Sequence, residues 1–294
     1  MSDLITIERQ EVRVTTPEGK TLTMPLDQFL AKIAPPRIDT GGLILPDGVK
    51  AAFSRGPVTI WVYEAPPRVY GLRWLADDSP ERFGKGAKYR PVRLALPYLV
   101  VLAVFATDPN GQLLLSQRNE CYFRTAPLKA VEDELFYPAL LNCSKIISPD
   151  GRAMSWICTQ HLNFAALARE RDLHRRLCSS FQALRHCLLE TGFNYSSEHH
   201  EGSSWFSESN RIDPRISTVE KWQQASREDP LFVLEVPWLK TGLSLGQTVD
   251  ALVHLFGVGR QTYDSAGALA RVVLNQELKG KRPALWMHIL SQSF

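Results

Sequence analysis

The chain lacks the short motifs that identify several large enzyme classes. It contains no Gly-x-x-x-x-Gly-Lys-Ser/Thr phosphate loop, no Gly-x-Ser-x-Gly nucleophile elbow and no His-Glu-x-x-His zinc motif. Gly257-Val258-Gly259 begins a dinucleotide-binding pattern, but Thr262 stands where the third glycine belongs. These absences weigh against P-loop nucleotide hydrolases, α/β-hydrolases, zinc metalloproteases and Rossmann dehydrogenases.

Cysteine is scarce, and long apolar runs are absent. The five cysteines form no Cys-x-x-Cys pair, and their count is odd. The most apolar stretch, 94–106, is 13 residues long and is broken by Pro97, so it is too short to span a bilayer. Asp3 lies near the start of the chain, and no apolar run of signal-peptide length follows it. The sequence therefore predicts reduced thiols and a cytoplasmic protein.

A large excess of charge of either sign is also absent. The 294 residues include 34 Lys and Arg and 31 Asp and Glu, which gives a formal net charge of +3. Because the basic residues are scattered, we expect neither a nucleic acid nor a membrane as a partner. The hydrophobic fraction of 44% allows a sizeable core in one large domain or two small ones.

Strand patterns dominate the first half of the chain. Alternating residues over 3–15 and 21–24 predict a hairpin, and an apolar stripe predicts a helix over 25–33. Four further strands are expected at 58–63, 68–75, 96–106 and 112–115. They would form an antiparallel meander over 58–116, with the continuously apolar strand 96–106 at its centre.

The second half of the chain is richer in helix patterns. The best helix is expected at 169–193, with one apolar face that packs on the sheet: Leu173, Leu177, Phe181, Leu184 and Leu188. No clear periodicity is found over 117–165, and a polar loop is expected at 196–214. Further helices are expected at 216–228, 244–256 and 263–278, with an extended piece at 231–236. The order of elements predicts an α+β fold.

Asn142 and Cys143, in the aperiodic segment, are the first candidates for catalysis. Catalytic groups concentrate on irregular segments that are held by a rigid sheet. A thiol at Cys143 can form a thioester, and the Asn142 amide can donate a hydrogen bond to a tetrahedral oxyanion. The alternative is a buried cysteine that acts as a small hydrophobic residue.

Cys158 is the second candidate nucleophile, because His161 follows it three residues later. Residues 155–158 also fit a buried strand, which favours a core position for Cys158. His199, in the segment 198–201, would act as a general base if this segment folded over the cysteines. Since the only adjacent histidines there point apart on regular structure, we predict no metal site, and no motif implies a cofactor.

The order of several features along the chain points to a family. They are the early hairpin and helix, Leu45-Pro46, the Trp61–Tyr70 stretch, the strand over 97–106, Thr125-Ala126-Pro127, a cysteine further on, and a long helix that ends in Glu190–Asn194. Over about residues 20–200 the chain resembles the prokaryotic branch of the ubiquitin-conjugating-enzyme-like (UBC-like) superfamily, in particular family D of the PRTRC system protein B type.

This resemblance implies a four-stranded antiparallel meander flanked by helices and a thioester-forming cysteine after the fourth strand. It implies a hairpin and helix at 1–50, a UBC-like core at 51–200 and a helical region at 201–294 that packs on the core. The family has Pro-Asn several residues before Gly-x-Val-Cys-Leu, whereas here Asn142 adjoins Cys143. The nucleophile is therefore open between Cys143 and Cys158.

Three functions follow as hypotheses. The first is a conjugating-type acyltransferase that accepts the C-terminus of a ubiquitin-like protein from an adenylating enzyme and passes it to an amine. The second is an inactive UBC-like binding module or scaffold in a plasmid or defence system. The third is a cysteine hydrolase that uses His161, His199 or His200.

Overall fold

The computed structural model describes residues 4–8, 10–15, 19, 21–33, 44–76, 78–81, 86–108, 111–139, 143–148, 151–159, 162–190 and 205–256. The chain divides into two compact units. The smaller unit comprises Met1–Asp39, Arg55–Pro57 and Gly257–Phe294, and the larger comprises Thr40–Ser54 and Val58–Phe256. Antiparallel sheets with few helices make up both, so the predicted α+β class is confirmed.

The smaller unit contains a three-stranded sheet and a helix. Its elements are β1 (Leu4–Glu8), β2 (Glu11–Thr15), β3 (Thr21–Pro25) and α1 (Leu26–Ile33). The single strand expected over 3–15 is wrong, because the chain reverses and β1 pairs with β2 up to the pair Glu8 and Glu11. The predicted helix over 25–33 is confirmed, one residue shorter. Its packing closes a small core of Val12, Val14, Met24 and Phe29.

The larger unit is built on a nine-stranded antiparallel sheet. Six strands follow the order β12-β13-β10-β8-β5-β4; β9 pairs with β8, β11 with β10, and β14 with β11. The strands are β4 (Val49–Arg55), β5 (Val58–Ala65), β8 (Tyr98–Thr107), β9 (Leu113–Leu115), β10 (Glu120–Arg124), β11 (Glu134–Phe136), β12 (Cys143–Ile147), β13 (Ala153–Ile157) and β14 (Lys240–Ser244). The predicted central strand is confirmed as β8, whose residues from Leu99 to Phe105 are completely buried.

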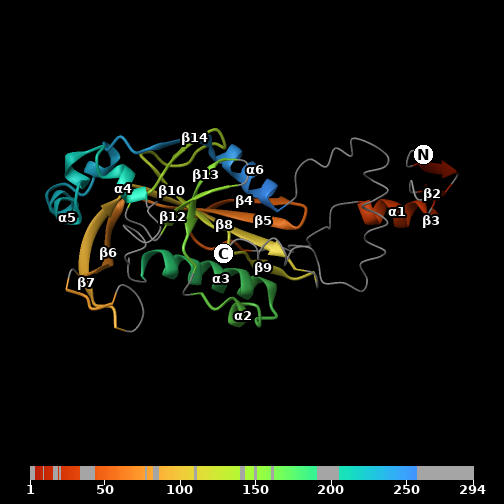
Figure 1. The fold of residues 1–294 in the computed structure, drawn as a ribbon, viewed down its shortest axis with the longest axis horizontal. Helices are drawn as coiled ribbons and strands as arrows, with labels where there is room; N and C mark the ends of the chain where they lie inside the picture. The colour runs from red at the N-terminus through yellow and green to blue at the C-terminus, as the bar shows by residue number, and fades with distance from the viewer. Residues whose placement is uncertain are drawn as a thin grey trace. The chain divides into compact units, whose positions relative to one another are not determined.

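The predicted meander over 58–116 is wrong in its pairing. Instead, β5 pairs directly with β8, and β6 (Arg68–Leu75) pairs with β7 (Tyr89–Leu96) in the same register. The four strands are therefore the two arms of one long hairpin, which is interrupted at Pro66-Pro67 on one arm and at Pro97 on the other. Proline has no N–H to donate, so the ladder breaks there while both arms continue as the β6–β7 ribbon (Figure 1).

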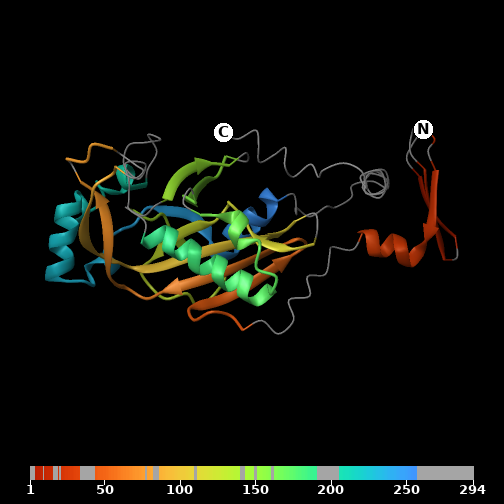
Figure 2. The ribbon, with the colours of Figure 1, turned by 90° about the horizontal axis from the view of Figure 1, so that it is seen from below.

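Helix α3 (Leu173–Leu189) covers one face of this sheet (Figures 1 and 2). It begins later than predicted because the Asp172 side chain accepts a hydrogen bond from Arg175 N and caps the helix. Its predicted packing on the sheet is confirmed, since Phe181 makes edge contacts with Trp61 and Tyr63 of β5.

The remaining described helices are short. They are α2 (Phe164–Leu167), α4 (Trp205–Ser209), α5 (Val219–Glu228), α6 (Leu245–Leu255) and the 3-10 helices Pro214–Ile216 and Phe232–Leu234. The predictions at 216–228 and 244–256 are confirmed, the extended piece at 231–236 is wrong, and the helix at 263–278 lies outside the described residues. The loop expected at 196–214 contains α4. No helix in the described ranges is long and apolar enough to cross a membrane.

Candidate functional site

Cys143 lies in a strand and not in an irregular segment. It is the first residue of β12 and pairs with Ile157 of β13. Cys143 is 4% exposed, and its side chain lies beside that of Cys121, a completely buried residue of β10. Burial raises the pKa of the Cys121 thiol well above its usual value. The Cys143 thiol is therefore not reachable by solvent in this structure, because β-pairing carries it into the core.

The predicted partners of the two candidate cysteines fall outside the described residues. These are Asn142, expected as the oxyanion donor, and His161, His199 and His200, expected as bases. Their roles stay predictions, and the geometry of the candidate site is set out from the cysteines and their described neighbours.

Cys158 directly follows β13 and is partly exposed. Its carbonyl oxygen accepts a hydrogen bond from the Cys187 thiol of α3, with a sulfur–oxygen distance of 3.0 Å. The buried strand predicted over 155–158 is confirmed as β13 (Ala153–Ile157), but it ends one residue before Cys158. Cys158 is thus the more accessible of the two candidate nucleophiles, at a point where the sheet is tied to α3.

Cys178 and His174 form a thiol–imidazole pair that the sequence analysis missed. They lie one turn apart on α3, with Sγ 3.8 Å from Nδ1 and 3.7 Å from Nε2 of the ring. Their four-residue spacing on a predicted helix was the available signal. Burial raises the pKa of Cys178, which favours the thiol over the nucleophilic thiolate.

A buried ionic cluster lies beside Cys121 on β10. Arg152 donates to both carboxylate oxygens of the fully buried Glu120, at 3.1 and 2.9 Å, and the Tyr122 hydroxyl donates to the same carboxylate. Burial raises the pKa of Tyr122, and the charge of Glu120 raises it further. Burial alone would lower the pKa of Arg152, but Glu120 more than offsets this effect. The cluster is charge-balanced, so it fits a structural role.

Helix α4 packs on β12, the strand of Cys143. The Trp205 ring stacks on Tyr137 with 3.6 Å between ring centroids, and the Lys145 ammonium lies 5.0 Å from the Trp205 centroid. Lys145 also donates to Glu208 of α4 at 2.5 Å. Through Lys145, two residues beyond Cys143, these contacts hold β12 against α4.

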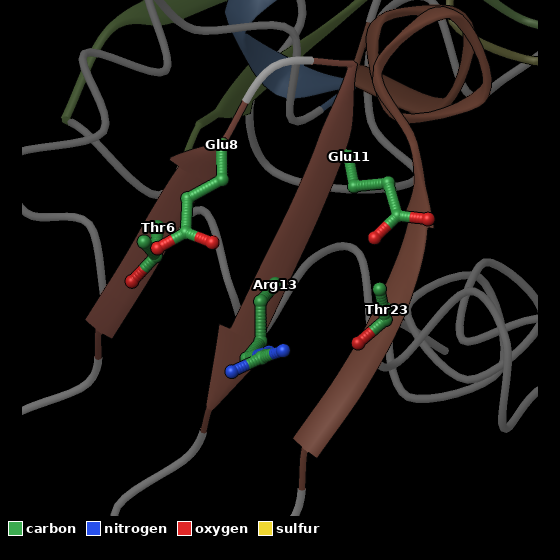
Figure 3. Close-up of a pocket in the computed structure, with 5 residues that line it drawn as sticks. All are labelled: Thr6, Glu8, Glu11, Arg13 and Thr23. Atoms are coloured by element: carbon green, nitrogen blue, oxygen red, sulfur yellow. The ribbon is translucent and has the colours of Figure 1, made fainter.

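A shallow pocket lies in the smaller unit, on the exposed face of its sheet (Figure 3). Its lining side chains come from all three strands: Thr6, Glu8, Glu11, Arg13 and Thr23. Arg13 stands on the central strand, so the pocket mixes both signs of charge and has no apolar floor. Among the described residues, no group of three His, Cys, Asp or Glu side chains is placed to hold a metal ion.

No family model matches this chain, and neither a curated protein nor a solved structure matches it.

Proposed function

We propose that the chain is a non-catalytic binding module in which Cys121, Cys143 and Cys187 are part of the core. One observation carries the proposal: Cys143 is 4% exposed and lies beside the completely buried Cys121. A cysteine that carries an acyl group must expose a thiolate to the donor's carbonyl carbon, and a buried apolar thiol is inert. The resemblance to the UBC-like superfamily suggests a ubiquitin-like protein as the partner.

The other core cysteines support the same proposal. Cys121 is completely buried, and Cys187 is 1% exposed and donates its thiol hydrogen to a backbone carbonyl. Thiols in such positions behave as small hydrophobic groups with one weak hydrogen bond.

The test is incubation with a ubiquitin-like protein, its adenylating enzyme and ATP. We expect a complex on size exclusion and no reductant-sensitive adduct. An adduct that is lost in Cys143→Ala and kept in the control Cys178→Ala would overturn the proposal and favour conjugation through Cys143.

A second candidate is acyl transfer through Cys158, which its partial exposure favours. It predicts an adduct that vanishes in Cys158→Ala and survives in Cys143→Ala. A cysteine hydrolase would instead turn over a small activated ester without any partner protein, and this turnover would be lost with the nucleophilic cysteine.

A further inference from the structure

Two arginines and two tyrosines gather where α3 approaches the bend of the long hairpin. The Arg185 guanidinium of α3 lies over the ring of Tyr63 of β5, at 4.5 Å from its centroid. The Arg68 guanidinium lies over the ring of Tyr70, both on β6, at 4.4 Å. Figures 1 and 2 both show an end of α3 beside the β6–β7 ribbon. We call these four residues the Arg–Tyr cluster.

Two buried polar atoms of the Arg–Tyr cluster have no hydrogen-bond partner. Tyr70 is 6% exposed, and its hydroxyl is buried without a hydrogen-bond partner, as is Nε of Arg185. Within the described part of the chain, no carboxylate forms an ion pair with Arg68 or Arg185. The contacts with the ring faces stabilise the two cations without an ion pair.

The two positive charges act on the same hydroxyl. Burial raises the pKa of Tyr70, and the nearby charges of Arg68 and Arg185 oppose this rise. Arg68 is exposed and Arg185 is half-buried, so one cation is open to solvent and the other is held on the helix. The cluster therefore offers several hydrogen-bond donors and a net positive charge around one buried oxygen.

We propose that the Arg–Tyr cluster binds a phosphate group, either free or carried by a nucleotide. Buried donors in native proteins are almost always paired, so donors left unpaired mark a place for an ion or water. The planar guanidinium fork matches the oxygen atoms of a phosphate. Two arginines carry two positive charges, which favours a doubly charged phosphate over a singly charged carboxylate as the ligand. Because Arg68 is exposed and covers the Tyr70 ring, its rotation admits the phosphate to the hydroxyl. This inference is independent of the proposed function, since no cysteine takes part.

Isothermal titration of the full chain at constant ionic strength tests the proposal. The probes are inorganic phosphate, AMP and, as the phosphate-free comparison, adenosine. We expect Arg68→Gln and Arg185→Gln each to weaken phosphate binding about tenfold, the usual effect of losing a charged hydrogen bond. Tyr70→Phe keeps the ring and its packing, and we expect a severalfold loss. The matched controls are exposed arginines on the same elements, Arg73→Gln on β6 and Arg175→Gln on α3.

The outcomes show whether the cluster binds phosphate and whether the phosphate is free or part of a nucleotide. Tighter binding of AMP than of inorganic phosphate supports a nucleotide ligand, and equal binding supports the phosphate group alone. The proposal is overturned if phosphate does not bind, if adenosine binds as well as AMP, or if the control variants weaken binding as much as the cluster variants. Tyr70→Phe that folds and binds phosphate like the wild type also overturns it.

Discussion

At the residue scale, Phe181 carries the contact between α3 and the sheet. It is completely buried and makes edge contacts with Trp61 at 6.0 Å and with Tyr63 at 5.3 Å between centroids. We predict that Phe181→Ala lowers the free energy of unfolding by about 3–5 kcal/mol, measured by urea denaturation. The control Gln182→Ala, exposed on the same helix, is expected to change it by less than about 0.5 kcal/mol. A loss below about 1 kcal/mol for Phe181→Ala would contradict this role.

The sequence predicts side-chain burial well where a pattern repeats, and poorly at single residues. The apolar face of α3 was predictable because five side chains recur with helical spacing. The burial of Cys143 was not, because it depends on Cys121 and on β13, which approach it only through the pairing of strands. The cluster of Glu120 and Arg152 could not be predicted for the same reason. Both side chains are charged, and only their ion pair offsets the desolvation cost of burying them.

At the element scale, Gly48 positions the start of β4 against β5. Its φ is +84°, and an added Cβ would lie 2.5 Å from Cε2 of Tyr63. Gly111 has a similar φ of +80° but open space around it. A substitution at Gly111 therefore measures backbone strain alone, without crowding. We predict a loss of about 1–2 kcal/mol in the free energy of unfolding for Gly111→Ala. For Gly48→Ala we expect at least about 1 kcal/mol more from overpacking. Equal losses in thermal or urea unfolding would contradict the close approach to Tyr63.

The 3-10 helix Pro214–Ile216 is tied to its neighbour by Asp213 and Arg215. The hydrogen bonds from Arg215 hold the pKa of Asp213 below its usual value, and Arg215 also pairs with Glu235 at 3.0 Å. A lowered folded-state pKa stabilises the protein above the unfolded-state value near 4, and this stabilisation is lost as the pH falls through the folded-state pKa.

We therefore predict that Asp213→Asn costs about 1–2 kcal/mol at pH 7 and progressively less below about pH 4, in urea titrations at several pH values. The control Asp78→Asn removes an exposed carboxylate 3.8 Å from Lys88 and is expected to have little effect at any pH. A cost of Asp213→Asn that stays constant from pH 7 to pH 2 would show that the charge is not responsible.

Short strands without a clear pattern were missed. The strands β10, β11 and β12 contain three to five residues each, and β10 is buried along its whole length, including Glu120 and Arg124. Such a strand shows neither alternation nor a continuous apolar run. The prolines led to a different error. Pro66-Pro67 is a sequence signal for a turn, but here it marks a bend within one arm of the long hairpin, between β5 and β6.

At the scale of the whole molecule, the two compact units allow a direct test of independent folding. Six of the seven tryptophans lie between Trp61 and Trp238 in the larger unit, and residues 1–39 contain none, so a change in fluorescence on deletion of 1–39 reports mainly the larger unit. Because that unit has its own buried core around β8, we predict that deletion of 1–39 changes its fluorescence-detected free energy of unfolding by less than about 0.5 kcal/mol. A loss above about 2 kcal/mol would show instead that the units stabilise each other.

The converse prediction concerns residues 1–39 alone. Their described core consists of four buried side chains, Val12, Val14, Met24 and Phe29, with three partly buried neighbours. Chains below about 40 residues rarely bury enough apolar area to offset the entropy of ordering without a disulfide, a metal or a partner, and this segment contains no cysteine. We therefore expect the isolated peptide to show the circular dichroism of an unfolded chain. A cooperative thermal transition in the peptide would contradict this expectation, and would mean that its strand pairing outweighs the small size of its core.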